Sequence, residues 1–305
     1  MNKNQHFYDS APAMAIRTDK MRLVRGASVL VDDVSITFRP GEFVSILGPN
    51  GAGKSSLLKL LTRETAPTSG EIAWDGRSLR DWSPIEMARR RAVLPQESAL
   101  SFPFPVHEVV MLGRAPHLQG AESARDHRIV QECLDLAGIT PLANRSYLTL
   151  SGGEKHRVHF ARVLAQMHEA KADNCIARAS AGGADGTGAR AVAADTFVGG
   201  SAYLMLDEPT AALDLYYQHR VLHTAKKLCA TGIGVITIVH DMTLAGRYAD
   251  RIVLLEKGKV VADDTAEAVL CSPTMERVFG VRIHRHVSPE DGSAVYVASP
   301  PVATD

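Results

Sequence analysis

Eight consecutive residues near the start of the chain combine the residue types that phosphate binding requires. They match G-x-x-x-x-G-K-[ST] and are Gly48, Pro49, Asn50, Gly51, Ala52, Gly53, Lys54 and Ser55. Glycines let the backbone curve so that its N–H groups point at phosphate oxygens. The lysine adds a positive charge, and the serine hydroxyl is a ligand for Mg²⁺. The motif predicts a nucleotide site, although many classes of enzyme share it.

A second set of candidate residues follows an apolar run at 203–206, which ends in Asp207 and Glu208. Alone, two acids after a strand are more often a solvated turn. After a phosphate-binding loop they favour hydrolysis, because parallel strands end at one edge of a sheet. Asp207 is then expected to hold Mg²⁺, and Glu208 to orient and polarise the attacking water.

Alternating strands and helices are predicted to position these residues. Short apolar runs that read as strands lie at 21–24, 34–38, 42–47, 71–74, 92–94, 202–206, 234–239 and 251–255. Helical spacing follows the glycine-rich loop at 55–62 and recurs at 84–91 and through 99–168. This alternation predicts an α/β fold with a mainly parallel sheet that is covered on both faces.

The remaining segments differ in composition. Residues 1–20 are polar and aperiodic and are expected to form a loose tail. Residues 169–201 contain 10 alanines and 6 glycines among 33 residues, which predicts a flexible surface insertion. Residues 263–305 are expected to form a C-terminal extension, with a helix at 266–278 and a hairpin of two alternating runs.

Composition excludes several classes of protein. The chain has 305 residues, with 34 basic and 34 acidic side chains, so a general nucleic-acid binder is not expected. No apolar run approaches the roughly 20 residues that span a bilayer, and no export signal is apparent. The four cysteines form no CxxC pair, which favours neither a disulfide framework nor a zinc site and fits a reducing cytosol.

Three further motifs carry a family resemblance. They are Leu150-Ser151-Gly152-Gly153-Glu154, Ala211-Ala212-Leu213-Asp214 and Val239-His240-Asp241, and Gln96 lies between the first strands and the helical region. With the glycine-rich loop and the Asp207-Glu208 pair, they resemble the ATP-binding subunits of ABC transporters, in that family's order. The resemblance covers about residues 21–270.

This resemblance implies a P-loop NTPase fold, with a RecA-like core, an antiparallel β-subdomain and an inserted helical subdomain at 99–168, all within 21–262. It implies ATP and Mg²⁺ as cofactors, and two copies of the chain that enclose two ATP molecules head to tail. Residues 48–55 and Ser56 would bind ATP, and Ser151, Gly152, Gly153 and Glu154 would contact the partner copy's ATP. Asp214 would cross the dimer interface, Glu208, His240 and Gln96 would act in catalysis, and Ser55, Gln96 and Asp207 would hold Mg²⁺.

Local segments also suggest a cargo. Residues 101–110 with 112–117 look like the ATPases of iron-siderophore, haem and vitamin B12 importers, and 210–215 with 276–281 are most similar to hemin-import ATP-binding proteins. The resemblance implies an ATPase at the cytoplasmic face of the inner membrane, peripheral to two copies of a transmembrane permease. A periplasmic hemin-binding protein would act with it indirectly, and no nucleic acid is implied.

Several alternatives stay open. The cargo could instead be a ferric siderophore or vitamin B12, or the chain could be a non-transport ABC ATPase. The family usually stacks an aromatic residue on adenine, whereas that place falls near Arg25 here, whose guanidinium could stack instead. The stretch Phe102-Pro103-Phe104-Pro105 is expected to be either an exposed permease contact or ordinary core packing.

Overall fold

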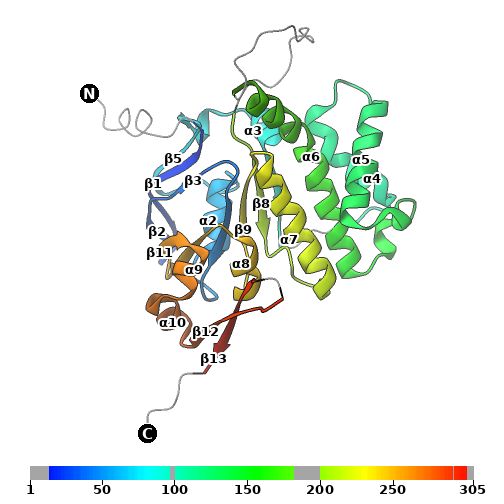
Figure 1. Cartoon of the computed structure of the whole chain (residues 1–305). Coiled ribbons are helices and arrows are strands. Elements are labelled where there is room, and N and C mark those ends of the chain that lie inside the picture. Colours follow the sequence, from blue (N-terminus) through cyan, green and yellow to red (C-terminus); the bar gives the residue numbers. More distant parts are fainter. Residues whose placement is uncertain (1–13, 97–99, 182–199, 291, 301–305) are drawn as a thin grey trace.

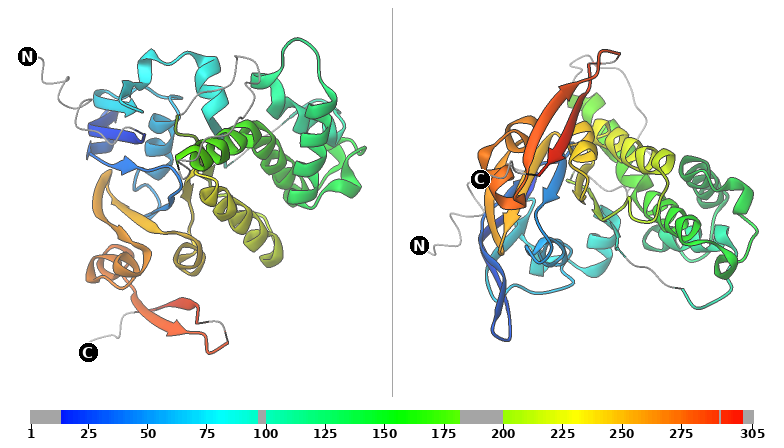
Figure 2. Two further views of the ribbon diagram at one scale, coloured as in Figure 1. Left: turned by 45° about the horizontal axis from the view of Figure 1, so that its top comes forward. Right: turned by 90° about the horizontal axis from the view of Figure 1, so that it is seen from below.

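The computed structural model describes residues 14–96, 100–181, 200–290 and 292–300. Two larger sheets, a two-stranded sheet near the C-terminus and a group of helices make up this part of the chain (Figure 1). The antiparallel strands near the N-terminus lie on one side of the central sheet, and the helices α4, α5 and α6 lie on the other (Figures 1 and 2). None of the helices in the described ranges combines the length and hydropathy that a membrane span needs.

A six-stranded sheet in the order β11-β10-β4-β9-β8-β7 forms the centre of the chain. Its strands are β4 (Phe43–Leu47), β7 (Arg91–Leu94), β8 (Tyr203–Asp207), β9 (Gly234–Ile238), β10 (Arg251–Glu256) and β11 (Lys259–Thr265). The strands from β10 to β7 pair in parallel, and β11 pairs with β10 in antiparallel orientation. Strands β4, β8 and β9 are buried throughout, as expected where helices cover both faces. The predicted α/β fold is confirmed.

The second sheet is antiparallel and starts earlier than the sequence indicated. It contains β1 (Ile16–Arg25), β2 (Ser28–Val34), β3 (Thr37–Phe38), β5 (Ser69–Trp74) and β6 (Arg77–Ser78). The predicted tail at 1–20 is therefore wrong from Ile16 onward, while residues 1–13 lie outside the described ranges. Ile16 and Thr18 are buried, and the Thr18 hydroxyl donates to the Val34 carbonyl at 3.1 Å. Ile16 is followed by four polar residues, and this polar run had concealed the strand.

Helices separate the parallel strands of the central sheet along the chain, and α4, α5 and α6 follow one another without a strand between them. Before the long helix α6 lie α2 (Lys54–Leu61), α3 (Pro84–Arg90), α4 (Val106–Met111) and α5 (Ala124–Ala137), with the 3₁₀ turns η1 (Leu79–Asp81), η2 (Leu112–His117), η3 (Thr140–Leu142) and η4 (Tyr147–Thr149). After it come α7 (Leu215–Ala230), α8 (Met242–Tyr248), α9 (Ala266–Leu270) and α10 (Pro273–Phe279). The region 99–168, predicted to be helical, thus holds α4, α5 and the first half of α6.

Helix α6 runs over Gly152–Ala181 and extends into the segment 169–201 that was predicted to be a flexible insertion. That prediction is wrong for the helical part and for the end of the segment, because Ser201 is fully buried. Its hydroxyl donates to Asp75 Oδ1 at 2.5 Å and accepts from Trp74 Nε1 at 2.7 Å. Alanine-rich sequence suits a helix as well as a loop, which explains the error. Residues 182–199 lie outside the described ranges.

The C-terminal region differs from prediction in one respect. The single helix expected at 266–278 is two, because Pro273 cannot continue a helix and Ser272 caps the second one by accepting from the Met275 N–H at 3.1 Å. The hairpin is β12 (Arg282–Val287) paired with β13 (Ala294–Ser299). The proposed boundary after residue 262 falls inside β11. Tyr296 of β13 is buried, so the hairpin packs on the core.

Two hydrophobic clusters lie on opposite faces of the six-stranded sheet. Leu204 and Leu206 of β8 face the helical side with α4, α5 and α6. Tyr203 and Met205 of the same strand face the antiparallel sheet and α2. This alternation follows from the two-residue period of a strand, and it holds the carboxyl ends of the parallel strands in place for the site.

Candidate functional site

The glycine-rich loop connects β4 to α2 and is packed between two strands that come from different sheets. Gly48 has φ 150° and Gly53 has φ 99°. A Cβ on Gly48 would lie 2.3 Å from the Leu255 carbonyl oxygen, and one on Gly53 would lie 2.3 Å from the Leu30 carbonyl oxygen. Only glycine fits at both places. Gly53 caps α2 without any side-chain hydrogen bond, so the first N–H groups of the helix are free of side-chain caps and suit an anion.

Lys54 folds back over this loop. Its side chain is buried, and Nζ donates to the carbonyls of Gly48 at 2.8 Å and Pro49 at 3.0 Å. Burial lowers the pKa of Lys54, while the carboxylates of Glu208 and Asp207 act in the opposite direction. The ammonium group therefore lies against the backbone of the first two residues of the loop.

Ser55 and Asp207 bring two oxygen ligands together. The Ser55 hydroxyl, in the first turn of α2, donates to Asp207 Oδ1 at 3.4 Å, and Asp207 ends β8. Burial raises the pKa of Asp207, the Ser55 hydrogen bond lowers it, and the charge of Glu208 raises it further. A hydroxyl and a carboxylate at one point are hard ligands of the kind that Mg²⁺ takes alongside water and phosphate, so these residues fit that ion.

Glu208 is the centre of a three-residue cluster. Its Oε2 accepts from Gln96 Nε2 at 2.9 Å, and its Oε1 lies 2.6 Å from His240 Nε2. The three residues follow β7, β8 and β9, so strands far apart in sequence deliver them to one sheet edge. Glu208 has φ 51°, a strained conformation for a non-glycine residue of the kind found at functional sites.

The Ser151–Glu154 motif stands apart from this cluster. The Ser151 N–H and hydroxyl both donate to Glu154 Oε2 at 2.8 Å, and the Glu154 N–H donates to the Ser151 hydroxyl at 3.3 Å. These bonds form a capping box that starts α6. Within the described ranges, no hydrogen bond or ion pair joins either residue to the glycine-rich loop. Ser151 and Gly152 are exposed, whereas Gly153 and Glu154 are partly buried.

Asp214 lies close to this motif through its own loop. Its carboxylate caps α7 by accepting from the Tyr217 N–H at 3.0 Å. A Cβ on Gly153 would lie 3.0 Å from the Ala212 carbonyl oxygen. The loop that carries Asp214 is therefore in contact with the start of α6.

Comparisons with known proteins agree with this geometry. A family model described as ABC transporter matches residues 31–170. The hemin import ATP-binding protein HmuV of Pseudomonas entomophila is 43% identical over 277 residues, which cover 91% of this chain and 97% of that protein. HmuV of Gloeobacter violaceus is 43% identical, covering 84% and 85%. This chain belongs to the ABC transporter family.

Solved structures share the fold of this ABC protein. A metal-chelate type ABC transporter in an inward-facing conformation superposes with a TM-score of 0.70 at 22% identity, covering 94% of this chain and 98% of that chain. A dimeric ATP-binding cassette in a post-hydrolysis state, bound to ADP and Pi, gives a TM-score of 0.65 at 25% identity, with 82% and 98% covered. The two alignments confirm an ABC ATPase fold.

The Phe102–Pro105 stretch of this ABC protein is exposed. Phe102 is 65% exposed and Phe104 is 39% exposed, with ring centroids 6.0 Å apart. Of the two expectations for this stretch, core packing is therefore wrong. Phe104, Glu108 and Leu112 border a surface pocket of about 330 Å³ on the helical side.

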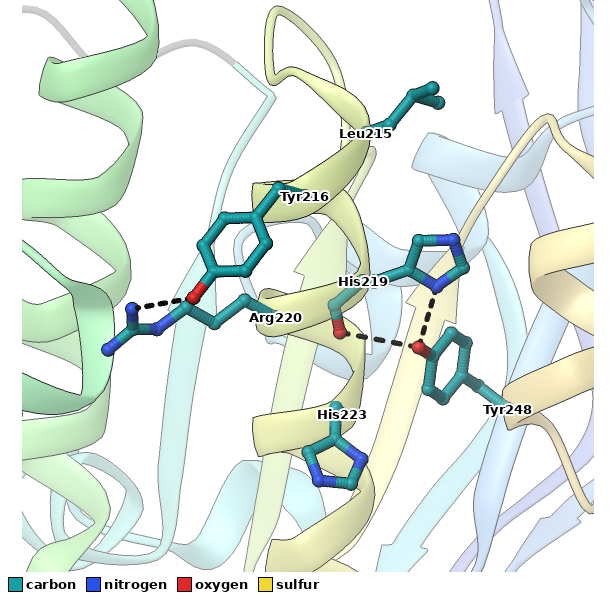
Figure 3. A pocket seen from close by; sticks show the side chains of 6 residues that line it. All are labelled: Leu215, Tyr216, His219, Arg220, His223 and Tyr248. Carbon is teal, nitrogen blue, oxygen red and sulfur yellow. Dashed lines mark hydrogen bonds between the residues drawn. The ribbon is translucent and has the colours of Figure 1, made fainter.

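A larger pocket lies on α7 and α8 and was not foreseen from the sequence (Figure 3). Tyr216, His219 and His223 of α7 line it together with Tyr248 of α8. In Figure 3 the Tyr216 ring lies beside Arg220, and the His219 ring faces Tyr248. His219 Nδ1 lies 2.8 Å from the Tyr248 hydroxyl. The rings of His219 and His223 point apart, and the described residues hold no group of three or more potential metal ligands. The pocket is separate from the phosphate-binding residues.

The backbone contacts that hold the glycine-rich loop have no signal in the sequence. The carbonyls of Leu30 and Leu255 restrict the loop glycines, yet nothing in their side chains signals this role. Gln166 is a partly buried polar residue between the buried residues Ala165 and Met167 of α6, and a polar residue at such a position is a signal that the sequence does contain.

Proposed function

We propose that the chain is the ATP-hydrolysing subunit of an ABC importer that takes up hemin across the inner membrane. The observation that carries the hydrolytic part is the Glu208 carboxylate, which contacts both Gln96 and His240 beside the Lys54 loop. An ion pair with a purely structural role needs two side chains, whereas here residues that follow β7, β8 and β9 all contact one carboxylate. Arranging an acid, an amide and an imidazole at a phosphate-binding loop suits hydrolysis of a phosphoanhydride.

ATP would lie with its phosphates in the loop. Backbone N–H groups of 48–55 and the first turn of α2, including Ser56, would bind the phosphate oxygens. Lys54 Nζ would leave the Gly48 and Pro49 carbonyls for the β- and γ-phosphates. Arg25, exposed at the end of β1, would stack on adenine in place of an aromatic ring.

Mg²⁺ would be held by Ser55 and Asp207, with Gln96 as the third residue close enough to join them on rearrangement. When bound, the ion neutralises the charge that develops on the phosphate oxygens. The protein supplies two of its ligands, which is usual for an ion that keeps water and phosphate in its shell.

Glu208 would accept a proton from the attacking water as that water bonds to the γ-phosphorus and the bond to the ADP oxygen breaks. His240 would turn from Glu208 Oε1 to the γ-phosphate, and Gln96 would orient the water. Both residues already contact Glu208, so each needs only a side-chain rotation to act.

A second copy of the chain would complete each site. The outward-facing N-terminus of α6, with Ser151, Gly152, Gly153 and Glu154, would meet the partner's ATP. An anion at a helix N-terminus is favourable because of the helix dipole. Asp214 would lie at the same interface. The dimeric cassette at 25% identity supports this arrangement.

The membrane partner would be two copies of a permease, which the chain contacts from the cytoplasmic face. The exposed Phe102 and Phe104, beside the Gln96 loop, support a docking surface there. Hemin as cargo rests on the names of the relatives, each 39–43% identical. A periplasmic hemin-binding protein would deliver it to the permease.

The Glu208→Gln variant tests the hydrolytic role. ATP binding is expected to persist, and the turnover number is expected to fall by about 100-fold to 10,000-fold, the usual effect of losing a general base. Phosphate release measures turnover, and calorimetry measures ATP affinity. Glu132→Gln, at an exposed position of α5, is the matched control. Turnover within threefold of the wild type in Glu208→Gln would refute the assignment.

Lys54→Ala is expected to lose ATP affinity.

Cargo is tested by growth. An iron-starved host that lacks this protein should fail on hemin, and the wild-type gene but not Glu208→Gln should restore growth. Normal growth on hemin with failure on a ferric siderophore or loss of vitamin B12 uptake would keep the ATPase role and change the cargo. Normal growth on all three substrates would favour a non-transport ABC ATPase.

A further inference from the structure

The side chain of Gln166 joins two parts of the chain that carry different functional residues. Its Nε2 donates one hydrogen to the Ala88 carbonyl at 2.8 Å and the other to the Arg91 carbonyl at 2.9 Å. A primary amide has two N–H donors, so both are used. Ala88 is in the last turn of α3, where carbonyls lack helical partners, and Arg91 starts β7.

Gln166 lies on the helix whose N-terminus is Gly152, with the Ser151 cap just before it. The separation between Ser151 and Gln166 is 15 residues, or about 22 Å along a helix axis. A movement of the α6 N-terminus therefore reaches Gln166 through continuous helix.

Strand β7, which receives the bond, leads directly to Gln96. It is the last strand in the sheet order and pairs with β8 alone among the described strands. Its pairing places Leu94 opposite Leu206, so Gln96 comes level with Glu208 across the edge of the sheet. An edge strand lacks a second neighbour that would hold its position, and the Gln166 amide supplies this support.

Two further hydrogen bonds support the junction between α6 and the corner that joins α3 to β7. His117 Nε2 lies 2.9 Å from the Gln166 backbone carbonyl, and because a carbonyl only accepts, that nitrogen is the donor. Arg89 Nε donates to the Pro116 carbonyl at 2.9 Å. Together they join the corner between α3 and β7 to η2 and α6, and the Gln166 amide is the member that contacts β7 itself.

We propose that Gln166 is a positioning residue that couples α6, which begins at the Ser151 motif, to β7 and thereby sets where Gln96 meets Glu208. Gln166 touches no reacting atom and acts through Gln96. The inference rests on the proposed function, because it gives the junction a role in ATP hydrolysis. ATP-dependent movement of the α6 N-terminus then shifts β7 and changes the contact between Gln96 and Glu208.

The test uses Gln166→Met and Gln166→Glu in the full chain. Both keep the length of the side chain and remove both donors, and Gln166→Glu also places a carboxylate against the two carbonyl oxygens, which repel it. Each is expected to lower the turnover number about 5-fold to 30-fold, the range of coupling between sites, and to leave the KM for ATP within twofold. Gln131→Met is the control, since that amide, within the part of the chain that the structure describes, bonds to Asp135 on the same helix and to no other element.

A double-mutant cycle with Gln96→Ala separates positioning from a merely structural role. If Gln166 acts through Gln96, Gln166→Met should cost nothing further once Gln96 is alanine. Additive losses, or unchanged turnover in both Gln166 variants at wild-type melting temperature, would overturn the inference. Wild-type turnover in both Glu208→Gln and Gln96→Ala would instead refute the proposed function.

Discussion

Replacing Gly53 with alanine tests how tightly the phosphate loop is held between the two sheets. The residue has φ 99°, and its new Cβ would lie 2.3 Å from the Leu30 carbonyl oxygen. Positive φ costs an alanine about 1–3 kcal/mol. Relief of the overlap costs about 1–3 kcal/mol more, because the contacted Leu30 carbonyl belongs to the backbone of β2 and cannot move aside as a flexible side chain could. The free energy of unfolding should therefore fall by about 2–6 kcal/mol.

Gly51 provides the control, since its φ is 77° and a Cβ there meets nothing within 4 Å. Gly51→Ala carries the backbone strain without the overlap. Urea unfolding without nucleotide should place Gly53→Ala about 1–3 kcal/mol below Gly51→Ala, and its melting temperature roughly 2–12 °C lower. Equal stabilities for the two variants would refute the reasoning that the loop is clamped.

Charge and burial predict the behaviour of two other variants and the reactivity of two cysteines. Asp207→Asn should raise the free energy of unfolding at pH 7, because burial raises the pKa of Asp207 and its charged form destabilises the ATP-free fold. The same variant should abolish turnover. The gain in the free energy of unfolding should vanish below about pH 4, where the wild-type carboxyl is protonated in both the folded and the unfolded chain. Arg114→Met should lower the free energy of unfolding by about 3–5 kcal/mol, because this buried guanidinium bonds to Asp126 and Glu169. Among the described cysteines, exposed Cys271 should react with a thiol reagent, whereas burial raises the pKa of Cys229 to about 12 and should protect it.

Each of these predictions has a direct control. The Asp207→Asn difference is followed by urea unfolding between pH 4 and 8, and a gain that grows as pH falls would contradict the sign. Arg125→Met removes an exposed partner of Glu169 and should change stability little. Mass spectrometry locates the modified cysteine, and rapid labelling of Cys229 in the folded chain would contradict its burial.

The site was predictable from the sequence where its residues follow strands. The runs before Gly48, Asp207 and His240 are almost entirely apolar, with Ser45 and Thr237 as the exceptions. Such runs predict buried parallel strands, and parallel strands bring their carboxyl ends together. Gln96 was harder to place from its own surroundings, because β7 has only four residues, and its assignment came from the family resemblance.

Other features could not be read from local sequence because they depend on distant backbone. The carbonyls of Leu30 and Leu255 meet the loop glycines through tertiary packing, and backbone groups leave no trace in residue type. The strand at Ile16 has polar side chains because one of its faces is exposed. The length of α6 was missed because alanine-rich sequence suits either a helix or a loop.

The two hydrophobic clusters on opposite faces of one sheet have a consequence for how the molecule melts. Leu204 and Met205 are neighbours in β8 but belong to different clusters, so neither cluster can come apart without exposing the back of the other. The helical and antiparallel regions therefore cannot melt as independent units, although they are distinct in shape. Heating should produce one cooperative transition, in which the calorimetric enthalpy equals the van't Hoff enthalpy.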